Sequence, residues 1–305
     1  MLYILVTACA WGLLAPSFKL IFASDPATFD GLSLAVARAT WTLPFMVFLL
    51  GTTWMLERPT FDRRSLVAFA ILGLIFGPGF MGLYSVATQH TSISHVAFLV
   101  GLAPASNAAL AAIAFNAPLD RVRKVALFLG VCGVALLAFT KSGNGASLLG
   151  DGLLIVWLGT FAVYSSVLRT VLTRYRLLFT MSLSGVIGTL LVTVIGIAVG
   201  KGGAIAHVTQ TSLVSWLFFG GVIVLSTLIS PVTFAQAVRT VGVAIATSAA
   251  EYIAIGIGLG FSLLVFHETW QPLLTIAGVA MLASLALTFA PAGIFGSNKF
   301  SPPTV

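Results

Sequence analysis

Charged residues are scarce in this sequence. They make up 8% of the 305 residues, whereas hydrophobic residues make up 59%. A soluble domain carries roughly 25% charged residues, and a water-soluble core of this size could not bury so much apolar side-chain surface. The composition therefore excludes an ordinary soluble domain and predicts that lipid surrounds most of the chain.

Cysteine is also rare, with only Cys9 and Cys132 in the chain. Both fall in apolar segments that we expect to span the membrane, so we predict no structural disulfide. The N-terminal stretch MLYILVTAC ends like a lipoprotein cleavage site, but it has no basic residue and its apolar part is too short for a signal peptide. We therefore expect no lipid anchor at Cys9.

Long polar segments are missing, and the connectors are too short to form a soluble domain. A membrane-spanning helix needs about 20 mostly apolar residues. The chain divides into ten such segments, near residues 2–22, 33–56, 65–88, 94–116, 122–140, 150–172, 177–199, 212–236, 243–266 and 271–292. The sequence thus predicts an all-α polytopic membrane protein with ten transmembrane helices.

The basic residues predict the orientation of these helices. Alternate loops and the C-terminal tail hold eleven basic residues, namely Arg58, Arg63, Arg64, Arg121, Arg123, Lys124, Arg169, Arg174, Arg176, Arg239 and Lys299. The opposite loops hold Lys141 and Lys201. The positive-inside rule then places both termini in the cytoplasm. The net charge of +7 follows from topology with membrane lipid as the counter-charge, so it requires no nucleic acid.

The chain also contains an internal repeat. Trp11 and Lys19 have the same spacing as Phe161 and Arg169, and GVCGVALLAF at 130–139 resembles GVAMLASLAL at 278–287. Each copy holds five predicted spans, so the second copy must enter the membrane inverted, as in many secondary transporters. We expect a first five-helix repeat at 1–145, an inverted second repeat at 146–292, and a cytoplasmic tail at 293–305.

Two stretches carry a resemblance to a known family. AWGLLAPSFK (10–19) and YSVATQHTSISHVAFLVGLAP (84–104), together with the five-plus-five layout, resemble the EamA-like branch of the drug/metabolite transporter superfamily, and within it bacterial exporters of aromatic amino acids. Many members have an acid and then a bulky aliphatic residue after the fourth and ninth spans. Here Asp120 lies in PLDR and Glu268 in HETW, so the second copy departs from that pattern.

The resemblance implies ten helices around a central cavity. The first, third, fourth, sixth, eighth and ninth helices would line it, the second and seventh would lie at its periphery, and the fifth and tenth would support it. The polar stretch QHTSISH (89–95) would be an outer turn between two cavity-lining helices. We expect His90 and His95 at the outer surface, where a role as a pH-dependent gate is one alternative to an ordinary surface position.

An aromatic stripe marks the sixth predicted span. Trp157, Phe161, Tyr164, Ser165 and Leu168 share one face of a helix. Such a face could stack on an aromatic ring and hydrogen-bond a carboxylate. Core packing, or an interfacial position for Trp157, is the alternative.

The third predicted span contains a helix breaker. Pro78 and Gly79 interrupt it, and Phe80 and Tyr84 follow on one face. A proline removes one backbone hydrogen bond and can bend a helix, so this site is either a hinge for alternating access or a static kink. Pro104 and Pro231 raise the same question in the fourth and eighth spans.

Glu251 is an acid inside an otherwise uncharged ninth span. An intramembrane acid is costly unless it is paired or hydrated, and it marks function by default. It could bind the ammonium group of a substrate or carry a proton, or it could be the structural partner of Arg38 or Lys19. Arg38 lies in the second span, where it could reach toward the membrane surface or form a structural pair, and a direct contact with substrate is a further alternative. The same alternatives hold for Lys19, near the outer end of the first span.

The full set of candidates extends these features to other polar and aromatic positions. The candidate substrate-binding residues are Trp11, Phe80, Tyr84, Phe98, Trp157, Phe161, Tyr164, Ser165, Gln236, Ser248, Glu251 and Tyr252, and the candidate hinge or gate residues are Pro78, Gly79, Pro104 and Pro231. For Gln236, a hydrogen bond between helices is an equal alternative.

The expected function combines the composition with the resemblance. The sequence lacks GxGD and HExxH, and no GxSG has a usable histidine within a span. We expect a monomeric secondary transporter, and not an enzyme, that exports small metabolites such as aromatic and other amino acids across the bacterial inner membrane without a cofactor or metal. The alternatives are a different solute, such as a drug or purine, and more remotely an intramembrane enzyme or a scaffold. Proton coupling stays open.

Overall fold

The computed structural model describes residues 1–114, 121–140, 147–241 and 243–288. Helix makes up 86% of the structure, and the described residues contain no strand. Six helical segments in this part of the chain are long and apolar enough to cross a membrane: Leu2–Ser24, Gly31–Glu57, Arg63–Gln89, Leu148–Leu172, Leu177–Ala198 and Leu213–Phe234. These findings confirm the expected all-α class with multiple membrane-spanning helices.

Helices occupy each of the ten predicted segments. In the first half they are α1 (Leu2–Gly12), α2 (Leu14–Ser24), α3 (Gly31–Glu57), α4 (Arg63–Leu74), the π-helix η1 (Ile75–Leu83), α5 (Tyr84–Gln89), α6 (Ile93–Val100), α7 (Ala103–Ala114) and α8 (Arg121–Ala138). In the second half they are α9 (Leu148–Leu172), α10 (Leu177–Ala198), α11 (Gly203–His207), the 3-10 helix η2 (Val208–Gln210), α12 (Leu213–Gly221), the π-helix η3 (Val222–Ile229), α13 (Ser230–Val241), α14 (Val243–Leu264) and α15 (Pro272–Thr288). That all ten segments cross a membrane stays a prediction.

Short polar side chains fix where several helices begin. Asp30, Asp62, Ser92, Ser147 and Ser212 precede α3, α4, α6, α9 and α12, and each accepts a hydrogen bond from the backbone N–H three residues later. This bond satisfies one of the backbone donors that a helix start leaves unpaired. The polar residues at the ends of the apolar segments therefore set the boundaries that hydropathy alone leaves approximate.

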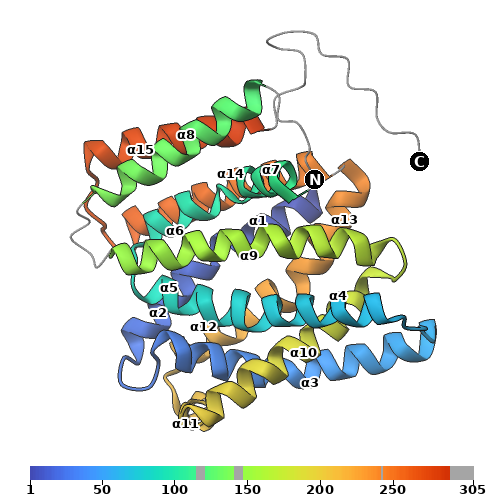
Figure 1. The fold of residues 1–305 in the computed structure, drawn as a ribbon. Coiled ribbons are helices and arrows are strands. Elements are labelled where there is room, and N and C mark those ends of the chain that lie inside the picture. The colour runs from blue at the N-terminus through green and yellow to red at the C-terminus, as the bar shows by residue number, and fades with distance from the viewer. Residues whose placement is uncertain (115–120, 141–146, 242, 289–305) are drawn as a thin grey trace.

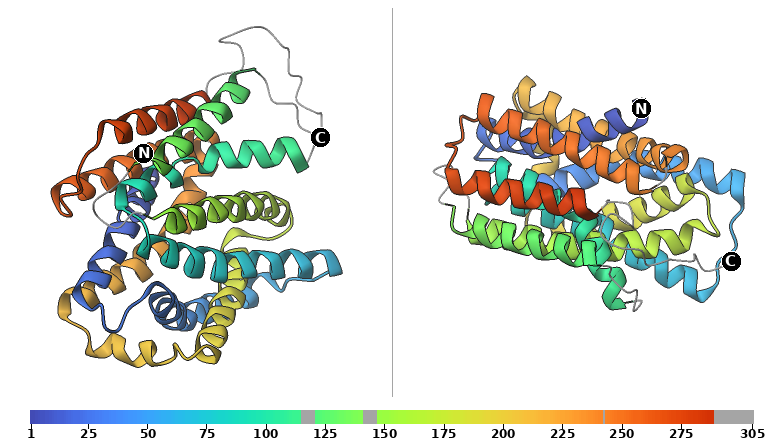
Figure 2. Two further views of the ribbon diagram at one scale, coloured as in Figure 1. Left: turned by 60° about the vertical axis from the view of Figure 1, so that its left-hand side comes forward. Right: turned by 90° about the horizontal axis from the view of Figure 1, so that it is seen from above.

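The helices run alongside one another in a bundle (Figures 1 and 2). α8 and α15 pack together at one edge, and α3 packs on α10 at the opposite edge. Between these pairs, α1 packs on α13 and α14, and α9 packs on α5, α7 and η1. The layers between the two edge pairs hold the residues considered below.

Glycine allows one pair of helices to touch backbone to backbone. A Cβ added to Gly77 in η1 would lie 2.0 Å from the carbonyl oxygen of Gly188 in α10, and one added to Gly73 would meet the Ile187 side chain. Small residues at four-residue spacing permit such close approach in lipid. Any larger residue at position 77 would force these two helices apart.

The candidate hinge residues lie in or beside irregular helical segments. Pro78 and Gly79 fall within η1, and Pro231 is the second residue of α13, directly after η3. Pro104 is the second residue of α7, where the lack of an N–H is tolerated, and Gly101 and Leu102 separate α7 from α6. π-Helical turns occur frequently at functional sites, but movement at these four positions stays a prediction.

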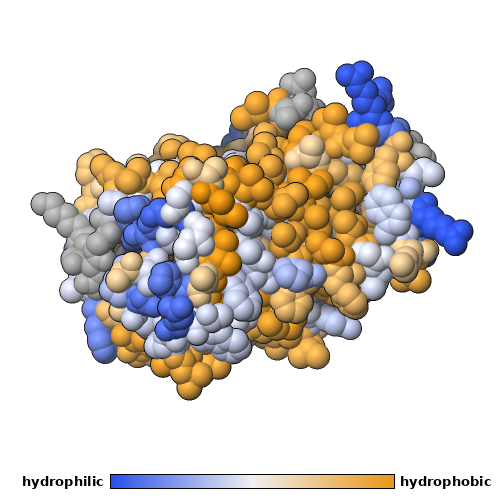
Figure 3. Space-filling model, turned by 90° about the horizontal axis from the view of Figure 1, so that it is seen from below, coloured by the Kyte–Doolittle hydropathy of each residue, from blue (hydrophilic) through white to orange (hydrophobic). Residues whose placement is uncertain are grey.

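Large apolar side chains cover much of the surface. Phe48, Met55, Ile113, Phe128 and Leu264 are each among the exposed hydrophobic residues. Figure 3 shows one such face, on which apolar side chains form a broad area and hydrophilic ones gather toward the two ends. A soluble monomer rarely exposes so large an apolar area, so the surface supports a multi-pass membrane protein.

Candidate functional site

A cavity of about 420 Å³ lies between the two halves of the bundle. Its walls come from α1, α2, α3, η1, α5, α6 and α7 of the first half, and from α9, α10, η3, α13 and α14 of the second. The volume falls within the range of small-molecule sites, about 300–1,000 Å³. The described parts of α8 and α15 contribute no lining residue, and a supporting role for the fifth and tenth helices stays a prediction.

The aromatic stripe of α9 faces this cavity. Trp157, Phe161, Tyr164, Ser165 and Leu168 all line it. The rings of Trp157 and Phe161 stack with centroids 5.5 Å apart and an interplanar angle of 27°. The stripe therefore presents a largely apolar wall with two hydroxyls. Ser165 donates to the Phe161 carbonyl within its own helix, and Tyr164 donates to Met181 Sδ at 3.6 Å.

Two aromatic residues from the third span extend the wall across the cavity. Phe80 of η1 lies edge to face with Tyr164 at 4.8 Å, and Tyr84 of α5 lies 5.4 Å from Trp157 between ring centroids. Such ring pairs add to the stability of an aromatic cluster. A ring of a bound solute would find both aromatic faces and aromatic edges on this cluster.

Eight of the twelve candidate substrate-binding residues line the cavity. They are Trp11, Phe80, Tyr84, Trp157, Phe161, Tyr164, Ser165 and Glu251, and Pro231 from the hinge group also lines it. The role of each in binding stays a prediction.

The structure places three further candidates elsewhere. Phe98 is buried against α15, where its ring fills the space beside Gly278. Tyr252 is 38% exposed, and its hydroxyl donates to the Leu282 carbonyl at 3.3 Å. Gln236 is partly buried but does not line the cavity, and the side chain of Ser248 lies outside the described residues. Periodicity placed these residues on plausible helices but not on the face that meets the cavity.

Glu251 of α14 is buried in the cavity wall. Only 2% of the residue is exposed, and its Oε2 has no hydrogen-bond partner among the described residues. No ion pair links it to Arg38 or Lys19 in this part of the chain. Lys19 instead donates to the backbone carbonyl of Gln89 at 3.3 Å. The structure therefore gives no support to the alternative in which Glu251 is a structural counter-ion.

Arg38 of α3 also lines the cavity. The resemblance implied a peripheral position for this second helix, so its contribution to the cavity wall was not expected. It is 5% exposed, and its Nε and Nη2 donate to Thr227 Oγ1 at 3.3 and 3.0 Å. The Phe18 ring lies 5.6 Å from the guanidinium carbon. A charged residue within a membrane span was the available signal, but the peripheral position implied for this helix argued against it. Leu177 and Met181 of α10, the seventh span, line the cavity as well.

Unpartnered polar atoms concentrate in this cavity. Six buried side-chain nitrogen or oxygen atoms of the described residues lack a hydrogen-bond partner, and four of them belong to lining residues: Arg38 Nη1, Asn107 Oδ1, Trp157 Nε1 and Glu251 Oε2. Buried polar groups are normally satisfied, so each exception needs an explanation. A bound solute or water would supply the missing partners. Asn107 was missed because a single polar residue in α7 has no periodic pattern.

The cavity extends toward one end of the bundle. Leu172, Tyr175 and Leu177, at the connection between α9 and α10, line its end. This connection lies at the same end as the α3–α4 turn (Figure 1). The charge distribution predicts that this is the cytoplasmic end.

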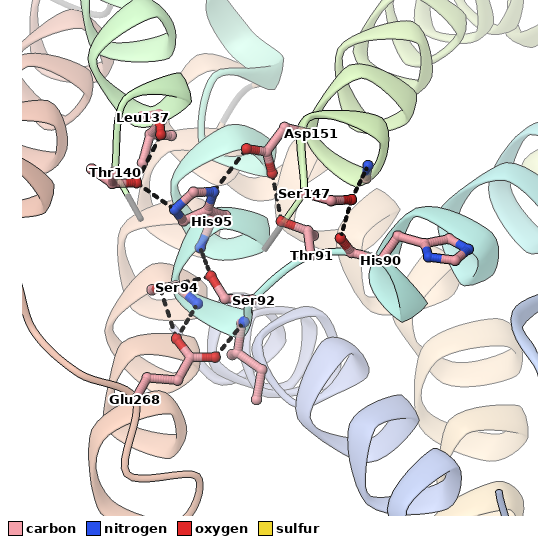
Figure 4. A network of polar contacts seen from close by, with 12 residues as sticks. His90, Thr91, Ser92, Ser94, His95, Leu137, Thr140, Ser147, Asp151 and Glu268 are labelled. Carbon is pink, nitrogen blue, oxygen red and sulfur yellow. Dashed lines mark hydrogen bonds and ion pairs between the residues drawn. The ribbon is translucent and has the colours of Figure 1, made fainter. Parts of the chain in front are cut away.

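Buried polar side chains occupy the opposite end of the bundle (Figure 4). His95 of α6 contacts Asp151 of α9 through Nδ1 and Oδ2 at 2.8 Å, and Thr91 donates to Asp151 Oδ1 at 2.5 Å. His95 Nε2 lies 2.8 Å from Thr140 Oγ1. Because the Thr140 hydroxyl donates to the Leu137 carbonyl at 2.7 Å, its oxygen accepts from Nε2–H.

Glu268 forms a second group of contacts beside this one (Figure 4). Its carboxylate accepts hydrogen bonds from the backbone N–H of Ile93 at 2.7 Å and of Ser94 at 3.2 Å, and from the hydroxyls of Ser94 at 2.7 Å and Ser262 at 2.6 Å. A carboxylate at a helix N-terminus is well placed for such donors. Glu268 thereby ties the start of α6 to the second half. Asp120, its counterpart in the first copy, lies outside the described residues.

The predicted turn between two helices at QHTSISH lies at residues 90–92, between α5 and α6, but the expected surface position of His95 was wrong. Thr91, Ser92, Ser94 and His95 are buried, and His95 is only 1% exposed. Thr91, Ser94 and His95 face carboxylates of the second half rather than water. The described residues contain no group of three histidine, cysteine, aspartate or glutamate side chains that could hold a metal ion, so hydrogen bonding accounts for this cluster.

Ionic contacts join further connectors at both ends. At the end with the polar network, Lys201 pairs with Asp30. Burial alone would raise the pKa of Asp30, but hydrogen bonds from Lys201 and from Ser33 lower it overall. At the cavity end, Arg174 pairs with Asp62 at 2.9 Å on the surface. Hydrogen bonds from Ser65, and then from Arg174, lower the pKa of Asp62 to about 2.

Comparison with known proteins agrees with this arrangement. A solved crystal structure, described only as that of a protein, has 14% sequence identity to this chain, covers 94% of each chain and has a TM-score of 0.56. At this identity the likeness concerns the fold alone. No curated protein matches the chain. Residues 1–139 match the EamA-like transporter family, which supports the drug/metabolite transporter superfamily and suggests a membrane transporter of small solutes.

Proposed function

We propose that this protein is a secondary transporter that exports small organic solutes, aromatic and other amino acids among them, across the bacterial inner membrane. One observation carries the proposal. An aromatic cavity of about 420 Å³ lies between the two halves and contains buried Glu251. Substrate sites of secondary transporters lie between repeats near the membrane midplane. The likeness of residues 1–139 to a family of transporters, which are not enzymes, favours the same function.

Ten helices in two inverted repeats are part of this proposal. The π-helices η1 and η3 lie in the third and eighth predicted spans. Tyr84 follows η1 and Ser230 follows η3, and these two residues are 146 positions apart (230 − 84). Packing partners are also exchanged between the halves. α9 of the second half packs against the third and fourth spans, and α1 of the first half packs against the eighth and ninth. Such reciprocity supports the repeat of 1–145 in 146–292.

The proposed mechanism is alternating access. The cavity reaches the α9–α10 connection, whereas the network of His95, Asp151 and Glu268 occupies the other end. With both termini in the cytoplasm, this arrangement is the inward-facing state. A substrate would enter from the cytoplasm, and rocking of the halves about Pro78, Gly79, Pro104 and Pro231 would break the outer network and open the cavity outward.

Glu251 decides between two modes of energy coupling. If Glu251 binds the substrate ammonium group only, the protein is a facilitator that lets a high cytoplasmic concentration drain outward. If Glu251 exchanges a proton in each cycle, the protein is a proton antiporter. Replacement by glutamine keeps the shape and removes the charge. A proton antiporter would lose its response to a pH gradient in Glu251→Gln, whereas a facilitator would show no such response in either form.

The test is uptake of a labelled solute panel into liposomes that hold the purified protein. We expect saturable uptake of phenylalanine that tryptophan and methionine compete. Uptake of a drug or purine without any amino-acid uptake would support the transport function and contradict the proposed amino-acid substrate. If the reconstituted protein is folded but takes up no solute of the panel, the result would favour the remote alternatives of an intramembrane enzyme or a scaffold.

A further inference from the structure

We infer that Arg38 binds an anionic group of the substrate while Glu251 binds a cationic group of the same molecule. The site would then select small zwitterions, and the aromatic wall would take their side chain. This inference rests on the proposed function, because it names the substrate class of that cavity. It also gives the second helix, α3, a direct part in binding.

The guanidinium of Arg38 is held in place but incompletely satisfied. Thr227 of η3 accepts from Nε and Nη2, and the Phe18 ring packs nearby. Nη1, which carries two N–H groups, has no partner among the described residues. The edge formed by Nη1 and Nη2 is one of the two that can pair with a carboxylate through two parallel hydrogen bonds. Thr227 thus occupies the Nε–Nη2 edge of the guanidinium and leaves Nη1 without a partner among the described residues.

A purely structural role does not account for these contacts. A buried cation is costly to desolvate unless an anion and further hydrogen bonds compensate for it. Only 5% of Arg38 is exposed, and no carboxylate of the described residues pairs with it. A neutral donor would satisfy Thr227 equally well. The uncompensated charge is explained if the missing anion belongs to the substrate.

Glu251 provides the opposite charge in the same cavity. Its Oε2 also lacks a partner, so neither charge neutralises the other through an ion pair. Tyr84 lies within electrostatic range of both Arg38 and Glu251, so the two charges share one neighbouring residue in the cavity wall. A molecule with a carboxylate and an ammonium group a few bonds apart would satisfy both.

The experiment deletes one charge from the protein and one from the ligand. Binding to the purified full-length protein is measured by calorimetry for L-phenylalanine, for 3-phenylpropionate, which lacks the ammonium group, and for 2-phenylethylamine, which lacks the carboxylate. The variants are Arg38→Gln, Arg38→Lys and Glu251→Gln. Arg121→Gln on α8 is the matched control, because it makes the same chemical change at an exposed position outside the cavity. Thermal unfolding of each variant checks the fold.

We expect Arg38→Gln to raise the Kd of phenylalanine and of phenylpropionate at least tenfold and to change that of phenylethylamine less than twofold. Arg38→Lys should retain part of the affinity, since it keeps the charge without the planar fork. Glu251→Gln should show the reverse pattern, with loss confined to the two ligands that carry an ammonium group.

Two outcomes overturn the inference alone. The first is equal loss of all three ligands in Arg38→Gln with an intact fold. The second is unchanged phenylpropionate binding. If Arg38→Gln fails to fold, the ligand pattern of Arg38→Lys and the reverse pattern of Glu251→Gln decide. If the wild-type protein binds none of the three ligands, the amino-acid substrate of the proposed function is rejected, and the inference with it.

Discussion

His95 of α6 and Asp151 of α9 form a buried contact between the two halves, with Nδ1 and Oδ2 2.8 Å apart. Each has a further partner, Thr140 for the histidine and Thr91 for the aspartate. The contact lies at the end opposite to the cavity mouth. It therefore joins the two halves at that end, where the proposed mechanism requires a closed gate.

Loss of this contact should weaken the closed outer end. Leaving a buried hydrogen-bonding group without its partner costs roughly 1–3 kcal/mol, so we expect Asp151→Ala to lower the melting temperature by several degrees. It should also increase the labelling of a cysteine introduced at Phe80 by an outside thiol reagent, in a background without Cys9 and Cys132. Asp25→Ala, an acid at the same end without a hydrogen bond between the halves, is the control. Unchanged labelling in Asp151→Ala would show that the network is structural and not a gate.

The aromatic wall should discriminate between substrates by their side chains. Stacking of one aromatic ring on another contributes about 1 kcal/mol beyond the burial of apolar surface. We therefore expect Trp157→Ala and Tyr164→Ala to raise the KM of phenylalanine and tryptophan at least fivefold and that of alanine or serine less than twofold. Phe128→Ala, at an exposed apolar position of α8, should change neither. Equal loss for all substrates would indicate damaged packing instead.

The pair of Asp62 and Arg174 should not contribute to any pH dependence near neutrality. A carboxyl whose pKa is lowered in the folded protein adds stability above its unfolded value, roughly 4, and loses it as the pH falls through the folded value. The pKa of Asp62 is about 2, so the loss falls far below physiological pH. Transport rates of Asp62→Ala relative to wild type should be constant from pH 5 to pH 8. A ratio that changes across this range would mean that Asp62 titrates there.

The helical class and the positions of the helices were predictable from the sequence, because hydropathy over about 20 residues is a strong signal in a chain with so few charges. The aromatic stripe of α9 was predictable for the same kind of reason. Trp157, Phe161 and Tyr164 repeat with the period of a helix and therefore share one face. When one of them lines the cavity, the others line it as well.

The missed features depend on how helices rotate and meet. Arg38 was assigned to a peripheral helix, but α3 turns this side chain toward Thr227 on the second half. His95 was placed at the surface because its neighbours are polar, whereas its buried partner Asp151 lies 56 residues away in the sequence. Glu268, which accepts from Ile93 and Ser94 beside it, lies more than 170 residues away. Pairings over such distances leave no local pattern.

Blocking the cavity tests the central claim most directly. The measurement is counterflow of labelled phenylalanine in liposomes, with and without a pH gradient, for wild type, Ser165→Trp and Ser166→Trp. Ser165 lines the cavity and Ser166, its neighbour on α9 with similar burial, does not. We predict saturable counterflow for wild type and Ser166→Trp, and at least a tenfold loss for a folded Ser165→Trp. Equal counterflow by all three proteins would contradict a transport path through this cavity.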